Sequence, residues 1–248
     1  MKVIVVKDKK AMGKKGAELI AADMKKKDRP YVLGLATGST PETMYAEWAS
    51  MCKKGEVDFS TVITFNLDEY VGLKPTHDQS YRYFMNDKLF NHVNINKKNT
   101  FVPDGMAKDT EASCAAYEAK INACGGIDYQ VLGIGSNGHI AFNEPGSSLG
   151  SRTRKVKLTE NTIKDNSRFF KSMSEVPKSA ITMGIGTILE AANIILLASG
   201  ANKVEAVAAA IEGPITASCP ASALQTHPNV TFVLTEDAAT GLKLMHQS

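Results

Sequence analysis

Three side chains that can hold or transfer protons lie within eight residues, in the segment Asn137 to Glu144. The segment follows an apolar run that ends in glycines, as a loop at a strand end does. An unperturbed imidazole titrates near neutral pH, so His139 can both take and give a proton. Glu144 can orient that imidazole, and Asn137 can hold a substrate hydroxyl. A lone histidine is usually structural, but these neighbours favour a catalytic one.

Two adjacent carboxylates, Asp68 and Glu69, follow another apolar run. Adjacent residues of an extended chain point to opposite sides, so we do not expect them to act as a paired dyad. A carboxylate partly shielded by Phe65, Leu67 and Tyr70 can serve as a general base. The structural alternative is a carboxylate that caps a backbone N–H, and the residues alone leave both roles open.

Small and hydroxylated residues connect the second predicted strand to the next helix. Gly38 lets the backbone turn and approach a ligand, and the hydroxyls of Thr37, Ser39 and Thr40 would face an anion beside the helix N-terminus. Thr40 is also expected to cap the helix, with Pro41 in its first position. A Gly-Lys-Ser/Thr ending is missing, so this is not a nucleotide P-loop. A tight turn with a capped helix is the simpler alternative.

Two isolated cations add to the prediction of an anion site. Lys203 lies at a predicted helix start, where a positive charge opposes the helix dipole. Arg168 lies between polar and aromatic residues, where a guanidinium can close on a phosphate with two hydrogen bonds. Solvation is the ordinary reason for such charges, and an anionic ligand is the functional one.

The segment Gly133 to Gly138 matches the G-x-G-x-x-G fingerprint of dinucleotide sites. That fingerprint needs a helix at its third glycine, whereas Pro145 and Gly146 interrupt one. The acidic residue expected about 20 positions later is missing, because Thr153–Lys157 is basic. We therefore expect no nicotinamide cofactor.

Apolar runs alternate with amphipathic segments along the whole chain, which predicts a mostly parallel sheet covered by helices on both faces. We predict one α/β domain over residues 1–248. Residues from about 152 to 180, charged at first and without a long apolar run, suit a mobile lid. The predicted strands are Lys2–Val6, Tyr31–Ala36, Val62–Asn66, Tyr129–Gly133, Asn193–Leu197 and Val230–Leu234. The predicted helices are Lys10–Lys26, Pro41–Lys53, Gln79–Leu89, Thr110–Ala123, Glu160–Asn166, Lys203–Ile211 and a segment after Glu236.

Composition argues against several classes of partner. The net charge is only +3, and the basic clusters lack interleaved aromatic residues, so a nucleic-acid groove is not expected. The four cysteines are scattered without metal-ligand spacing, which predicts reduced thiols and no metal. No apolar run reaches the roughly 20 residues of a membrane helix or forms a signal-peptide core. We expect a cytoplasmic protein.

In order along nearly the whole chain, these motifs resemble those of the glucosamine-6-phosphate deaminase family. The resemblance implies a Rossmann-like α/β fold and conversion of glucosamine 6-phosphate and water to fructose 6-phosphate and ammonia, without metal or organic cofactor. The segments that carry it are Thr37–Pro41, Phe65–Tyr70, Gly138–Pro145, Asn166–Phe170, Met183–Thr187 and Gly200–Lys203.

Carried over by position, the resemblance makes Asp68 the base that moves a proton between C2 and C1. His139 would open the sugar ring with Glu144 as its partner. Asn137 stands where some members have aspartate, so we expect it to position His139 or the ring oxygen and not to accept a proton. The expected phosphate contacts are Gly38, Ser39, Thr40, Arg168 and Lys203.

Some members of that family are hexamers activated by N-acetylglucosamine 6-phosphate through basic residues after an Arg-Thr-Arg segment. Here Arg152–Arg154 is followed by Lys155-Val156-Lys157, so the basic pattern is shifted. We predict no such activation and a monomer or small homo-oligomer. Two alternatives remain: a hydrolase like 6-phosphogluconolactonase, and a sugar-phosphate-sensing module without catalysis.

Overall fold

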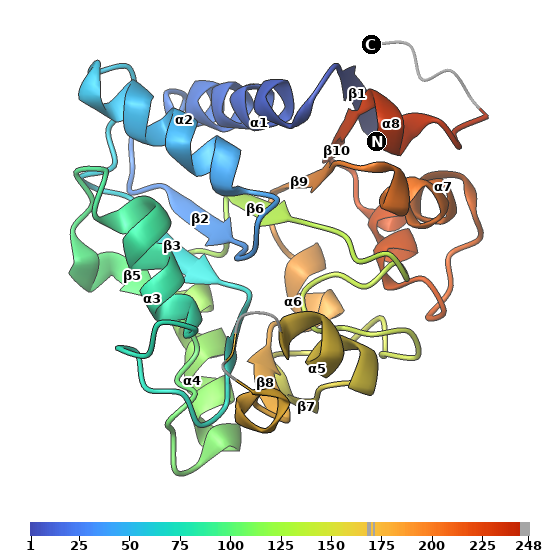
Figure 1. Cartoon of the computed structure of the whole chain (residues 1–248). Coiled ribbons are helices and arrows are strands. Elements are labelled where there is room, and N and C mark those ends of the chain that lie inside the picture. Colours follow the sequence, from blue (N-terminus) through green and yellow to red (C-terminus); the bar gives the residue numbers. More distant parts are fainter. Residues whose placement is uncertain (168–169, 171, 244–248) are drawn as a thin grey trace.

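The computed structural model describes residues 1–167, 170 and 172–243 and has a seven-stranded sheet at its centre (Figure 1). Every neighbouring pair in this sheet is parallel, in the order β1-β10-β9-β6-β2-β3-β5. Its strands are β1 (Lys2–Val6), β2 (Val32–Leu35), β3 (Ile63–Asn66), β5 (Thr100–Phe101), β6 (Tyr129–Leu132), β9 (Asn193–Ala198) and β10 (Val230–Thr235).

Helices cover both faces of the sheet, because its central strands are apolar on both sides. In Figure 1 α1 and α2 lie above the sheet, whereas α6 lies below it and α7 lies to its right. The predicted three-layer α/β arrangement is therefore confirmed. The α-helices are α1 (Lys9–Met24), α2 (Glu42–Lys53), α3 (Tyr81–Met85), α4 (Thr110–Ala123), α5 (Glu160–Ser167), α6 (Ile185–Leu189), α7 (Val204–Glu212) and α8 (Glu236–Ala239). Shorter helical turns are η1 (Asn86–Phe90), η2 (Lys97–Asn99), η3 (Met173–Glu175), η4 (Ala201–Lys203) and η5 (Pro220–Thr226).

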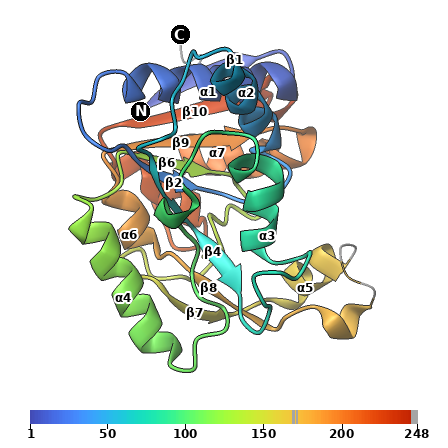
Figure 2. The same ribbon diagram turned by 90° about the vertical axis from the view of Figure 1, so that its left-hand side faces the viewer.

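A second, antiparallel sheet of three short strands lies between α4 and α5 (Figure 2). It has the order β4-β8-β7, with β4 at Asp68–Tyr70, β7 at Arg154–Lys157 and β8 at Ser179–Thr182. The sequence patterns did not predict it. Its β4 follows β3 after a single residue, Leu67, so the chain passes from one sheet into the other at the acidic pair.

The six predicted strands are all present, with ends shifted by at most one residue. One local prediction is wrong: Thr40 does not cap α2. The helix begins at Glu42 with Pro41 as its N-cap, and the Pro41 carbonyl accepts the Tyr45 N–H at 3.0 Å. The proline ring fixes φ near the helical value, so Pro41 takes the N-cap position with φ −79° and ψ −7°. The helix therefore starts one residue later than predicted, and the Thr40 hydroxyl lies outside it.

Part of the segment predicted to be a lid belongs to the small sheet. Strands β7 and β8 belong to the small sheet, and Leu158 donates its N–H to the carbonyl of Lys178 at 3.0 Å. These pairings leave residues 159–178, with α5 and η3, as the segment that can serve as a lid.

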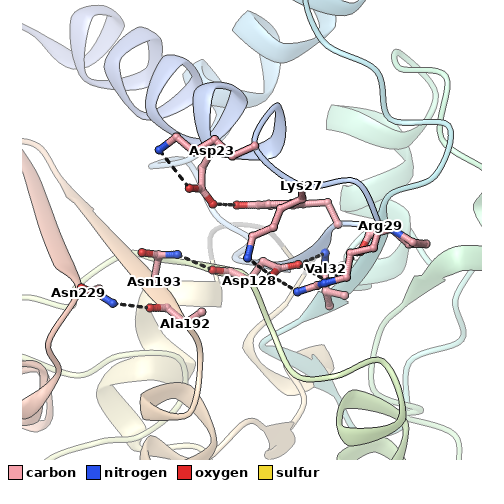
Figure 3. A network of polar contacts seen from close by, with 11 residues as sticks. Asp23, Lys27, Arg29, Val32, Asp128, Ala192, Asn193 and Asn229 are labelled. Carbon is pink, nitrogen blue, oxygen red and sulfur yellow. Dashed lines mark hydrogen bonds and ion pairs between the residues drawn. The ribbon is translucent and has the colours of Figure 1, made fainter.

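Polar side chains close the amino ends of the central strands (Figure 3). Asp128, just before β6, is only 3% exposed and receives two hydrogen bonds from the Arg29 guanidinium, at 2.6 and 3.0 Å. It also accepts the Val32 N–H at 2.9 Å, and Lys27 lies 3.6 Å away. The Asn193 side chain donates to the Asp128 carbonyl at 3.1 Å. Strands β2, β6 and β9 are thus joined at this end. Among the described residues, no helix is long and apolar enough to cross a membrane.

Candidate active site

A cavity of about 580 Å³ opens at the carboxyl ends of the parallel strands. The segments that line it include the turn after β2 with Gly38, β4 with Asp68, the loop after β6 with His139, and η4 after β9 with Lys203. Ligands of open α/β sheets bind at this edge. The structure therefore brings the predicted base, the predicted imidazole and the predicted anion site into one pocket.

The turn between β2 and α2 contributes Thr37, Gly38, Ser39 and Thr40 to the pocket wall. Gly38 has φ +91°, a conformation that side-chain-bearing residues rarely adopt. The three hydroxyls make no hydrogen bond to any residue that the structure describes. Because these donors are not used within the protein, they remain available to an anion. Lys203, on η4, lines the same pocket. Arg168, the other predicted cation, falls outside the described residues.

Asp68 is 6% exposed and lines the pocket from β4. Burial, and after it the charge of neighbouring Glu69, raise the pKa of Asp68 to about 8. Among the described residues, no side chain makes a hydrogen bond or an ion pair with this carboxyl group. A carboxyl with a raised pKa is a stronger base once ionised, so its burial suits proton transfer.

Glu69 points to the other side of β4 and has a structural environment. Its carboxylate accepts the backbone N–H groups of Tyr70, Tyr81 and Arg82 at 2.8, 2.9 and 3.0 Å. These donors include the first residues of α3, so Glu69 holds that helix against the small sheet. The two adjacent carboxylates thus have different environments, as the alternation of an extended strand predicts.

Glycine determines the shape of the histidine loop. The N–H of Gly135 donates to the carbonyl of His139 at 2.9 Å, and the N–H of Gly138 donates to the carbonyl of Gly135 at 3.1 Å. A Cβ atom at position 135 would lie 2.4 Å from the His139 ring. Gly135 is therefore needed for the imidazole to lie where it does. The sequence showed this glycine only as part of a misleading dinucleotide fingerprint.

His139 lies beside Glu144 and Asn137. Nδ1 of His139 is 3.4 Å from Oε2 of Glu144, is buried, and makes no hydrogen bond with a described residue. The Asn137 amide donates to that same Oε2 at 2.7 Å, and its oxygen accepts the His139 N–H at 3.2 Å. Asn137 thus makes hydrogen bonds to both His139 and Glu144. Asn137 and Glu144 lie behind His139 and do not themselves line the cavity.

The ionised form of Glu144 is strongly favoured. Burial alone would raise the pKa of Glu144, but the imidazole of His139 and hydrogen bonds from Thr162 and Asn137 lower it to about 2. The pocket therefore contains one carboxyl whose pKa is raised and borders another whose pKa is lowered. Two carboxyl groups whose pKa values differ in this way are typical of sites in which one group acts as an acid and another as a base.

The backbone next to His139 is strained. Ala141 has φ +51°, and it is the one residue other than glycine with positive φ among those described. Such conformations cost roughly 1–3 kcal/mol and persist where surrounding contacts impose them. The Asn143 amide supplies contacts here, donating to the carbonyls of Ile140 at 3.0 Å and Met183 at 2.9 Å. Arg154 of β7 in turn donates to the Asn143 oxygen at 2.9 Å.

Aromatic side chains form a wall of the pocket that the sequence patterns did not predict as a group. Tyr70 and Tyr81 lie with ring centroids 4.8 Å apart, and Phe142 lies 6.1 Å from Tyr81 with nearly parallel rings. Phe170 lies 6.1 Å from Tyr70. All four line the cavity, so one side of a bound ligand would be kept from water. Aromatic residues scattered between positions 70 and 170 carry no spacing signal that groups them.

The fold and the pocket define an α/β protein whose ligand site lies at the carboxyl edge of a parallel sheet, beside an acid–base loop. Residues 7–233 match the family described as glucosamine-6-phosphate isomerases/6-phosphogluconolactonase. The chain belongs to this family.

Relatives along the full chain carry one enzyme name. The chain is 54% identical over 240 residues to the glucosamine-6-phosphate deaminase of Thermoanaerobacter pseudethanolicus, covering 97% of this chain and 94% of the relative. It is 53% identical over 243 residues to that of Clostridium perfringens, covering 98% of this chain and all of the relative.

Two solved structures resemble this chain to different degrees. A monomeric glucosamine-6-phosphate deaminase superposes with a TM-score of 0.94 at 44% identity, covering 97% of this chain and 100% of the other. This match confirms the predicted Rossmann-like α/β fold. The 6-phosphogluconolactonase of Trypanosoma cruzi superposes with a TM-score of 0.77 at 21% identity, covering 98% and 97%. That likeness is one of fold.

Proposed function

We propose that this protein is an enzyme that converts glucosamine 6-phosphate and water to fructose 6-phosphate and ammonia. Relatives above 50% identity along nearly the whole chain carry the name of this deaminase. The observation that carries the proposal is the placement of Asp68 and His139 in one cavity with the hydroxyl-lined turn after β2. One bound sugar phosphate can then meet all three groups.

In the proposed reaction the phosphate is held by the turn at Thr37 to Thr40, together with Lys203 and Arg168. This anchorage positions the sugar so that later proton transfers are effectively unimolecular. His139, supported by Glu144, takes the proton of the C1 hydroxyl and returns one to the ring oxygen. The ring bond between C1 and its oxygen breaks, and an open-chain aldehyde forms.

Asp68 then acts on the open chain. Its carboxylate removes the proton from C2, next to the C1 carbonyl, and an enolamine forms. The same carboxyl group returns the proton to C1, which leaves an imine at C2. Water adds to that imine carbon, the C–N bond breaks, and the nitrogen leaves as ammonia. Every atom of the amino sugar and the water is thereby accounted for in the ketose and ammonia.

Absence of the allosteric activation known from the hexameric members is part of the proposal. Arg152 makes ion pairs with Glu118 and Glu190, at 2.5 Å each, so its charge is already balanced within the chain. Arg154 donates to Asn143. A monomer or small homo-oligomer fits the monomeric relative, and residues 159–178 are the proposed lid. We assign the enzyme to the cytoplasm, where phosphorylated sugars are held.

The test is a coupled assay for ammonium. We expect ammonium and fructose 6-phosphate to appear in equal amounts from glucosamine 6-phosphate and not from its N-acetylated form, whose nitrogen is an amide. Acid release from 6-phosphogluconolactone, without ammonium from the amino sugar, would support the lactonase alternative. Binding of the sugar phosphate without turnover would support the sensing module.

A further inference from the structure

Two different elements hold the carboxylate of Glu144. Its Oε2 accepts a hydrogen bond from the Asn137 amide of the same loop at 2.7 Å. Its Oε1 accepts one from the hydroxyl of Thr162, also at 2.7 Å. Thr162 belongs to α5, within the segment between β7 and β8, and lines the pocket. A helix that is remote in sequence therefore contacts the partner of the proposed acid–base histidine.

The Thr162 hydroxyl has a defined direction. Thr159, just before α5, donates its own hydroxyl proton to the Thr162 oxygen at 2.9 Å, and it accepts the Thr162 N–H at 3.2 Å. Because Thr159 uses the acceptor side of the Thr162 hydroxyl, the proton of that hydroxyl points to Glu144. Such chained hydrogen bonds strengthen one another.

The position of this carboxylate matters because His139 depends on it. Nδ1 of His139 lies 3.4 Å from Oε2, and a small rotation of the carboxylate decides whether the two groups meet. With Asn137 as its only partner, the Glu144 carboxylate would be held at Oε2 and could still rotate about that hydrogen bond. The second hydrogen bond, from Thr162, removes that freedom.

We propose that Thr162 is a positioning residue for this site, whose hydroxyl fixes the Glu144 carboxylate behind His139 and so makes the acid–base pair depend on the seating of α5. This inference rests on the proposed deaminase function for its effect on turnover, but the contact itself can be tested without substrate.

The charged and titratable groups around Glu144 come from several elements. His139 faces it directly from the same loop. Asp68 of β4 and Lys203 of η4 line the neighbouring cavity, and Arg154 of β7 donates to Asn143, the residue before Glu144. A pH profile of the variants therefore has to be compared with that of the wild type over the same range.

The first experiment compares Thr162→Val, which keeps the shape and removes the hydroxyl, with Thr162→Ser, which keeps the hydroxyl. We expect Thr162→Val to lower kcat for ammonium release about tenfold to a hundredfold, because hydrogen bonds to charged groups have effects of that size. KM should change little. Thr162→Ser should restore most of the activity. Lys164→Ala, an exposed change on the same helix, should behave as the wild type.

The second experiment measures the free energy of unfolding of wild type and Thr162→Val against pH, without substrate. The folded pKa of Glu144, about 2, lies below its ordinary value of 4.5, so its stabilising contribution is present above that value and is lost as pH falls toward 2. The difference between the two proteins should therefore be constant near neutrality and shrink from about pH 5 downward.

The outcomes separate the two proposals. If the wild type releases no ammonium, the deaminase proposal fails, yet the unfolding titration still decides whether Thr162 supports Glu144. A pH-independent stability difference between wild type and Thr162→Val would overturn the positioning role. Equal losses in Thr162→Val and Thr162→Ser would also overturn it, because they would show that shape matters and the hydroxyl does not.

Discussion

Two buried aspartates lie at opposite ends of the parallel strands, and only one of them has charged partners. Asp128, at the amino ends of the strands, has Arg29, Lys27 and a backbone N–H as partners (Figure 3). Asp68, at the carboxyl edge, has no side-chain partner among the described residues, and its pKa is raised to about 8. The two are nearly equally buried, at 3% and 6% exposure.

The contrast between Asp128 and Asp68 indicates why a buried carboxyl group without partners is kept. Burial of a charge without partners is costly, so a fold tolerates it only where another requirement maintains it. At the amino ends, partners offset that cost and the carboxylate joins strands. At the carboxyl edge the partners are missing, and the group keeps its basicity for a ligand. Each prediction below tests one side of this difference.

The largest expected effect is that of Asp68→Asn. It should lower turnover by at least about 10²–10⁴-fold, because the base is lost, while binding of the sugar phosphate stays largely intact. Its free energy of unfolding should not fall, since an amide replaces a carboxyl that had no partner. Ammonium release, calorimetric binding and urea denaturation measure the three quantities. Substantial residual turnover would contradict the assigned role.

The neighbouring Glu69→Gln is the matched control for Asp68→Asn. Glu69 accepts three backbone N–H groups, so this change should lower stability by about 1–3 kcal/mol. It should affect turnover of the folded protein far less. If the two variants behaved alike, the division between a structural and a reactive carboxyl would be wrong.

Gly135→Ala tests the close fit at the carboxyl edge. The new Cβ would lie 2.4 Å from the His139 ring, so the imidazole must move. Misplacement of a catalytic group by about 1 Å can cost roughly 10²-fold in rate, and we expect a loss of that order in kcat. Gly150→Ala is the control, because a Cβ at Gly150 meets no atom within 4 Å. Wild-type kcat in Gly135→Ala would show that the loop adapts.

Asp128→Asn tests the amino ends. We expect a loss of about 2–3 kcal/mol in the free energy of unfolding, since the charge-assisted hydrogen bonds of Arg29 weaken. Arg29 is partly exposed and can turn to water, which limits the loss. Lys27→Ala should cost less than about 1 kcal/mol, because its ion pair with Asp128 is longer, at 3.6 Å against 2.6 Å for Arg29, and is partly exposed. The kcat of both folded variants should match the wild type, and a changed kcat would contradict the separation of the two ends.

The last expected effect concerns stability alone and is a slope of the free energy of unfolding with pH. The folded pKa of Asp68, about 8, lies above its ordinary value of 3.8, so the folded protein retains a proton that the unfolded chain has released. Stability should therefore fall as pH rises from about 4 to 8, by up to about 1.4 kcal/mol per pH unit. Asp68→Asn should lose this contribution. Parallel stability curves for the two proteins would show that Asp68 is ionised in the free enzyme.

Six of the seven strands of the main sheet could be predicted from sequence, because they are continuous apolar runs such as that of β9. The seventh, β5, has only two residues and was not predicted. The small sheet could not be predicted either, because β4 has three residues and β7 is Arg-Lys-Val-Lys, whose short alternation is masked by charge. Its strands exist through pairing with β8 and not through local preference.

Part of the site followed from residue types, and part did not. Alternation along a strand correctly predicted that Asp68 and Glu69 face different ways, and the deviation at Asn137 pointed to a positioning amide. The support of Glu144 by Thr162 was not predictable, because these residues meet only through the tertiary fold. The role of Gly135 was missed because a short motif says nothing about which ring packs on a glycine.

The order of the strands in the main sheet also determines when this sheet can form during synthesis. Strand β10 lies between β1 and β9, and Lys2 pairs with Thr231 across the β1–β10 boundary. Thr231 comes 229 positions after Lys2 in the sequence, so during synthesis β1 is made long before its partner strand. A nascent chain that stalls before β10 would expose two unpaired strand edges at once, and such edges invite aggregation.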